Sequence, residues 1–186
     1  MTDQLSAHSA SHAVQFYAHD DELARGVSTY LDEALTSRET AIVVATAAHR
    51  RAFEARIGTA AEISAARAHG DLITVDAAEM IDLFLIGRQP DPSGLELVIG
   101  GLIRQALSTG RPVRVYGEMP AVLWDRGHVG AALELERLWT DLGQRLLVSS
   151  LCGYPAEAVA APEHAAARRE IFDLHTAVTG NPRTAP

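Results

Sequence analysis

Cysteine is scarce in this sequence. Cys152 is the one cysteine among 186 residues. A lone thiol excludes an intramolecular disulfide framework and a two-cysteine metal clip, so a reducing compartment is the simplest setting and we expect a cytoplasmic protein. No N-terminal secretory signal is visible, and charged residues or glycine interrupt every apolar run before it could span a bilayer. We therefore expect no membrane association.

Basic and aromatic side chains are also few. The 16 Lys and Arg side chains are outnumbered by 24 Asp and Glu, and the formal net charge is -8. Phosphate backbones and anionic membrane surfaces attract clustered Lys and Arg, so a net negative charge disfavours direct binding to nucleic acid or to such a membrane. Residues are 47% hydrophobic but only 5% aromatic. One sizeable core must therefore consist mostly of Leu, Val, Ile and Ala.

Motifs for phosphate and metal binding are missing. The first predicted strand is followed by Ala18-His19-Asp20-Asp21, which has neither the glycines nor the lysine of a phosphate-binding loop. No G-x-G-x-x-G follows any predicted strand. His8 and His12 are four residues apart, but no H-E-x-x-H motif or Cys/His cluster with metal-site spacing supports them. We predict no nucleotide cofactor and no metal site.

Strand-like and helix-like segments alternate along most of the chain. Continuous apolar runs predict strands over residues 13–17, 41–45, 72–75, 112–116 and 146–151. Amphipathic spacing predicts helices over 22–35, 59–69, 77–86, 95–107, 129–143 and 162–178, with a short one after Thr46. This alternation predicts a three-layer α/β fold, in which a mainly parallel sheet of about five strands carries helices on both faces. We expect a mobile tail at 1–11, a single domain at 12–178 and a disordered tail at 179–186.

The strongest candidate site is the corner where the strand at 112–116 ends. In parallel sheets, ligands usually bind beyond the carboxyl ends of the strands. Here such an end delivers Gly117-Glu118-Met119, with Trp124 close behind. A carboxylate beside a thioether and an indole could bind the polar group of a small, largely apolar ligand. The alternative is a structural role, in which Glu118 pairs with Arg114 or His128 and the tryptophans fill the core.

The helix predicted at 129–143 adds two candidates to this corner. If residues 131, 135, 138 and 142 face the core, Trp139 lies at the edge of that face and Glu136 lies further round. Cys152 ends a hydrophobic strand, where a buried and inert thiol is the commoner outcome. We therefore expect no enzyme, since no set of nucleophile, base and orienting group supports a Cys- or Glu-based hydrolase.

At these residues the chain resembles the MEDS domain, a sensory domain first described in methanogen and methylotroph regulators. The marks are Arg-Val-Tyr-Gly-Glu-Met at 114–119, Leu-Trp at 123–124, Leu-Glu at 135–136, Leu-Trp at 138–139 and Leu-Cys-Gly-Tyr-Pro at 151–155. Weaker marks are His12 with Phe16-Tyr17, His49-Arg50, and His175. The resemblance covers roughly residues 11–178.

The resemblance implies a non-catalytic input domain for hydrocarbon derivatives and similar small molecules, with a RecA-like sheet that lacks the phosphate loop. Related chains often carry a helix-turn-helix or a histidine-kinase-like ATPase. This chain has room for neither, so we expect the signal to pass to a separate regulatory protein or through homo-oligomerisation. The alternative is a ligand-independent interaction regulator in a sigma-factor, anti-sigma or histidine-kinase pathway.

Together, position and resemblance predict a ligand-binding set and no catalytic residue. The predicted set is Phe16, Tyr17, His49, Glu118, Met119, Trp124, Glu136, Trp139, Cys152 and Tyr154.

Overall fold

A parallel sheet forms the centre of the molecule. The computed structural model describes residues 10–180 and 182, and most of the two predicted tails lies outside them. Within these residues the main sheet has six strands, in the order β3-β2-β6-β7-β1-β8, and every pairing is parallel. Their bounds are β1 Ser11–Tyr17, β2 Thr40–Ala45, β3 Leu72–Asp76, β6 Val113–Gly117, β7 Ser149–Pro155 and β8 Ala177–Thr179. The predicted α/β class is confirmed.

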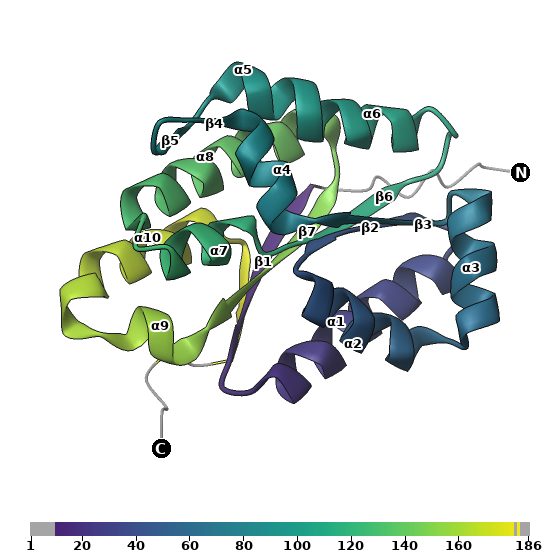
Figure 1. The fold of residues 1–186 in the computed structure, drawn as a ribbon, viewed down its shortest axis with the longest axis horizontal. Coiled ribbons are helices and arrows are strands. Elements are labelled where there is room, and N and C mark those ends of the chain that lie inside the picture. The colour runs from purple at the N-terminus through teal and green to yellow at the C-terminus, as the bar shows by residue number, and fades with distance from the viewer. Residues whose placement is uncertain (1–9, 181, 183–186) are drawn as a thin grey trace, which may run out of the picture.

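Helices cover both faces of this sheet. One face carries α1 (Asp20–Thr36), α2 (Ala47–Ile57) and α3 (Ala60–His69), seen together below the sheet in Figure 1. The other carries α4 (Ala77–Phe84), α5 (Pro92–Leu95), the π-helical turn η1 (Glu96–Gly100), α6 (Gly101–Leu107), α7 (Met119–Asp125) and α8 (Val129–Leu146). The chain ends with α9 (Ala156–Ala160), the 3-10 turn η2 (Pro162–His164) and α10 (Ala165–Leu174). A hairpin of β4 (Leu85–Ile86) and β5 (Gln89–Pro90) lies apart from the main sheet.

The two layers of core follow from strand alternation. In β2, Ala41, Val43 and Ala45 pack with α1, α2 and α3, whereas Ile42 and Val44 pack with the helices of the opposite face. A strand with both faces covered is apolar along most of its length; all six residues of β2 are buried, and the five from Ala41 to Ala45 are apolar. This continuous run is why the central strand could be predicted from sequence.

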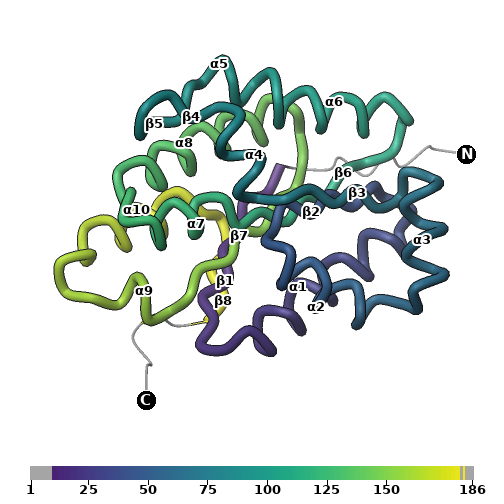
Figure 2. The backbone as a smooth tube through the Cα atoms, in the orientation of Figure 1, coloured from purple at the N-terminus to yellow at the C-terminus, as the bar shows by residue number. Residues whose placement is uncertain are grey.

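The edge strand β8 accounts for the difference between about five predicted strands and six. Residues 177–179 pair with Ala13, Val14 and Gln15 of β1, and Figure 2 shows β8 beside β1. The sequence pattern predicts a helix that includes residues 177 and 178, but α10 ends at Leu174. Three exposed residues are too few to show the alternation of a strand, so a pattern search cannot detect this short edge strand.

Other boundaries differ from the prediction for local reasons. Helix α8 continues to Leu146 and stops where Leu147 adopts a left-handed conformation, so β7 begins at Ser149 rather than at residue 146. Helix α7 was not predicted. Its signal was Pro120, because proline favours the first turn of a helix. No helix in the described part of the chain is long and apolar enough to cross a membrane.

The packing at Gly153 offers a test of this core. A Cβ at Gly153 would lie 2.6 Å from the hydroxyl oxygen of Tyr116 and 3.0 Å from a methyl of Leu23. We predict that Gly153→Ala lowers the free energy of unfolding by about 1–3 kcal/mol, because the overpacked atoms must move. Urea denaturation measures this change.

Gly101→Ala is the matched control. Gly101 lies in α6 with an ordinary helical backbone, and an added Cβ there meets no atom within 4 Å. That substitution should leave stability unchanged or raise it by about 0.5–1 kcal/mol. A Gly153→Ala variant as stable as the wild type would contradict the described packing.

Candidate functional site

A pocket of about 280 Å³ opens at the carboxyl ends of the central strands. Tyr17 and Pro155 contribute from the ends of β1 and β7, which are paired partners in the sheet. The remaining lining residues are Thr46 and His49 around the start of α2, Glu118 between β6 and α7, and Ala121, Val122, Asp125 and Arg126 of α7. We call it the strand-end pocket.

The carboxylate of Glu118 forms the polar floor of this pocket. It is 3% exposed. One oxygen accepts the backbone N–H of Thr46, and the other accepts from His49 Nδ1 at 2.6 Å and from the Tyr116 hydroxyl at 3.1 Å. Glu118 thus joins the end of β6 to the beginning of α2, two segments about seventy residues apart in sequence.

The predicted structural partners of Glu118 are wrong. Arg114 instead binds Glu39 at 2.5 Å and Glu33 at 3.1 Å. The partner of Glu118 is His49, which the sequence placed among the candidates without pairing the two. Neither residue type nor spacing signals this contact, because it depends on β2 and β6 being neighbours.

His49 lies between two acidic groups. Its Nε2 is 3.6 Å from the Asp20 carboxylate, and its ring stacks against Phe53 with centroids 5.8 Å apart. The hydrogen bond to Glu118 raises the pKa of His49 above its ordinary value, against the opposing effect of burial. Burial also raises the pKa of Tyr17, with Glu118 adding to it, so Tyr17 presents a neutral hydroxyl.

Three other predicted residues lie in a separate buried cluster. The Tyr154 hydroxyl donates to Glu136 Oε1 at 2.8 Å, and the Cys152 thiol lies 3.7 Å from Glu136 Oε2. His12 and His175, which the sequence offered only as weak marks of resemblance, approach the same oxygen at 3.4 and 3.6 Å.

The predicted orientation of Glu136 is wrong. Glu136 is 0% exposed and lies on the buried face of α8, whereas Leu138, placed on the core face, is only partly buried. A hydrophobic pattern treats a carboxylate as a surface residue, so it cannot detect one whose partners come from β1, β7 and the end of α10. Despite burial, these partners lower the pKa of Glu136 below its ordinary value, while burial and Glu136 raise that of Cys152.

The remaining predicted residues pack in the core. Phe16, Met119, Trp124 and Trp139 are all buried. Trp124 donates its indole N–H to the Ala158 carbonyl at 3.1 Å and meets Tyr154 edge to face. None of these four side chains lines the strand-end pocket.

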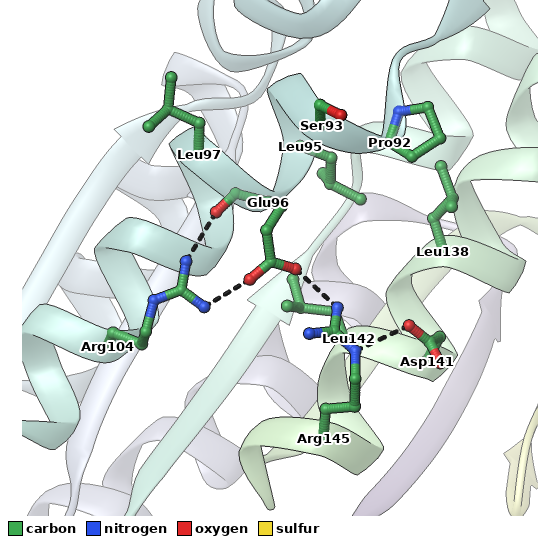
Figure 3. A pocket seen from close by; sticks show the side chains of 10 residues that line it. All are labelled: Pro92, Ser93, Leu95, Glu96, Leu97, Arg104, Leu138, Asp141, Leu142 and Arg145. Carbon is green, nitrogen blue, oxygen red and sulfur yellow. Dashed lines mark hydrogen bonds and ion pairs between the residues drawn. The ribbon is translucent and has the colours of Figure 1, made fainter.

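A groove of about 530 Å³ lies elsewhere, where η1 and α6 meet α8. Glu96 binds both Arg104 and Arg145, and Arg145 also binds Asp141 at 2.9 Å (Figure 3). These four charged groups satisfy one another, and the groove contains none of the predicted residues. The strand-end pocket, with Tyr17, His49 and Glu118, is therefore the candidate site.

The Glu118–His49 pair can be tested by titration. We predict that Glu118→Gln lowers the pKa of His49 toward about 6.5, because an amide cannot stabilise the imidazolium as a carboxylate does. NMR titration of the His49 ring measures this shift. Glu79→Gln, on the exposed side of α4, is the control and should leave the pKa of His49 unchanged.

The Glu118–His49 pair should also make the stability of the protein depend on pH. Since the folded-state pKa of His49 is raised, its contribution is fully present below the unfolded value of about 6.5 and is lost as pH rises through the folded value. The stability difference between wild type and Glu118→Gln should therefore shrink over that window. Identical titration of His49 in both proteins would contradict the pairing.

Comparison with known proteins assigns this chain to a family. The family model described as MEDS, the MEthanogen/methylotroph, DcmR Sensory domain, matches residues 11–175. No curated protein matches the sequence. The matched segment runs from the first residue of β1 to His175, and so contains both the strand-end pocket and the buried cluster. It covers most of the chain and indicates a sensory or signalling role. The chain belongs to the MEDS family of sensory domains.

Proposed function

We propose that this chain is a non-catalytic sensory domain that binds a small molecule in the strand-end pocket and passes the signal to a separate regulatory protein. The observation that carries the proposal is a buried Glu118 carboxylate at the floor of an open pocket, paired with His49. Cys152, the most obvious nucleophile, is buried outside this pocket, which supports a binding role over a catalytic one.

The pocket suits a short molecule with one polar end. Its volume of about 280 Å³ is small for a ligand site, and Ala121, Val122 and Pro155 provide apolar surface. A carboxylate offers about four acceptor positions, and three hydrogen bonds to Glu118 are described, so one position remains for a ligand. An alcohol or amine derived from a short hydrocarbon has this chemistry.

The contacts of Glu118 also supply a route for the signal. Glu118 directly precedes α7, and the N–H that it accepts belongs to Thr46, the N-cap of α2. A ligand that competes for this carboxylate changes the bonds that hold the starts of both helices. The outer surfaces of α2 and α7 would then have one arrangement without the ligand and another with it. A partner protein that binds one arrangement more tightly would respond to the ligand through a shift between the two populations.

A ligand-independent interaction regulator is the second candidate. Large apolar side chains are exposed on neighbouring elements: Leu83 of α4 is 64% exposed, Ile86 of β4 is 70% exposed and Leu97 of η1 is 77% exposed. Such exposure is typical of surfaces that meet other proteins. A partner recovered by pull-down whose affinity is the same with and without short alcohols and amines would favour this reading.

A pocket-filling variant tests the leading proposal. Short-chain alcohols and primary amines are titrated into the protein while its ¹H–¹⁵N spectrum is recorded. We predict saturable shifts at residues 46–49 and 117–126 for at least one probe. Val122→Phe should weaken that binding at least about tenfold, equivalent to about 1.4 kcal/mol, because the larger ring occupies the pocket.

Val178→Phe provides the same change at an exposed position on β8, outside the pocket, and should bind as the wild type does. Binding that survives in Val122→Phe, or shifts confined to another region, would reject the strand-end pocket as the ligand site.

A further inference from the structure

Four potential metal ligands converge inside the protein, apart from the strand-end pocket. His12 lies on β1, Glu136 on α8, Cys152 on β7, and His175 follows α10. One donor atom from each lies within 4.8 Å of all the others, and all four residues are buried. We call them the buried cluster.

The distances within the buried cluster resemble the edges of a metal coordination shell. His12 Nε2 lies 3.3 Å from Cys152 Sγ, and Glu136 Oε2 lies 3.4 Å from His12 Nε2, 3.6 Å from His175 Nε2 and 3.7 Å from Cys152 Sγ. Tetrahedral bonds of about 2.0 Å to nitrogen or oxygen and about 2.3 Å to sulfur place ligand atoms about 3.3–3.5 Å apart, and each of the four separations lies within about 0.3 Å of the expected one. These four separations therefore fit around one ion.

The hydrogen bonds of the two histidines fix which nitrogen faces the centre. His175 Nδ1 lies 2.6 Å from the Ile171 carbonyl, which can only accept, so Nδ1 carries the proton. Thr140 donates its hydroxyl to the Glu136 carbonyl, and therefore accepts from His12 Nδ1 at 3.0 Å. In each neutral ring, Nε2 then points a lone pair at the cluster.

This arrangement leaves too few protons for its acceptors. Two imidazole lone pairs and a carboxylate oxygen face one another, and the Cys152 thiol brings a single proton to share among them. His175 Nε2 is buried and has no hydrogen-bond partner among the described residues. A buried polar atom left without a partner is costly, and a cation at the centre would satisfy all of these acceptors together.

We propose that the buried cluster binds one divalent transition-metal ion of the zinc type through His12 Nε2, Glu136 Oε2, Cys152 Sγ and His175 Nε2. Two nitrogens, one oxygen and one sulfur suit Zn²⁺ in tetrahedral geometry. Binding releases the thiol proton to solvent, and the thiolate and carboxylate then neutralise the two positive charges of the ion. The proposal does not depend on a ligand in the strand-end pocket.

The surroundings of the cluster match those of metal sites. Thr140 and the Ile171 carbonyl orient the two imidazoles, and the Tyr154 hydroxyl holds Glu136 Oε1 so that Oε2 faces the centre. A cavity of about 50 Å³, lined by His12, Trp139 and Thr140 among others, adjoins the cluster at His12. Four protein ligands leave no open position, so the ion stabilises the fold or reports metal supply. It would tie the end of α10 to the sheet.

Cobalt provides a direct test. The reduced full-length chain is freed of metal with a chelator and titrated with Co²⁺. We expect one equivalent to bind, with visible bands of tetrahedral cobalt and a near-ultraviolet thiolate-to-cobalt band, both lost on adding Zn²⁺. Cys152→Ser should remove the thiolate band and weaken binding at least about tenfold, and His175→Ala should weaken it similarly. His69→Ala, at the exposed end of α3, should behave as the wild type.

Thermal unfolding of the wild type tests the same proposal without relying on variants that could fail to fold. The melting temperature of the wild type should rise with Zn²⁺ and return when the chelator is added. The proposal is overturned if the folded, reduced wild type binds neither ion, or if Cys152→Ser gives the same cobalt spectrum and affinity. Binding that His69→Ala also removes would likewise assign the ion to a surface site.

Discussion

Burial of two carboxylates constrains much of this structure. Removing an ionised carboxylate from water costs several kcal/mol unless hydrogen bonds and opposite charges offset the loss. Glu118 meets this requirement with Thr46, His49 and Tyr116, whereas Glu136 accepts from the hydroxyl of Tyr154 and the thiol of Cys152 and lies beside the imidazoles of His12 and His175. Neither set is local in sequence. Each carboxylate therefore holds distant segments of the chain together. A change in the charge or in the partners of either carboxylate would also change the stability of the fold.

The side chains that flank these two carboxylates lie in different layers of the core. Tyr116 and Phe53, beside Glu118 and His49, belong to the core layer under α1, α2 and α3, whereas Cys152 and Tyr154 belong to the opposite layer. The separation is nevertheless narrow, since Gly117 and Cys152 are register partners on adjacent strands. The strand-end pocket is lined from both faces, by residues around α2 and by α7, so an event there and one in the buried cluster would act on the same two strands.

The fold and one corner of the candidate site could be predicted from the sequence, because both depend on local patterns. Residues 41–45 are apolar throughout because both faces of their strand are covered, and Gly117-Glu118-Met119 lies at a carboxyl end where parallel sheets usually bind ligands. Prediction failed where the answer depends on long-range pairing. Spacing cannot show that His49 meets Glu118, that Glu136 turns inward, or that residues 177–179 pair with β1. The isolated His12 and His175 carried no metal motif, since topology alone brings them together.

Native mass spectrometry of the protein purified from its own host tests the central claim, ligand binding at Glu118, most directly. We expect a fraction of wild-type chains to carry the added mass of one small organic molecule, and a smaller fraction of Glu118→Gln chains to do so. A metal ion is distinguished by its isotopic mass and should be retained equally by both proteins. Wild-type chains free of any organic molecule, or equal retention by Glu118→Gln, would contradict the assignment of the strand-end pocket as the sensory site.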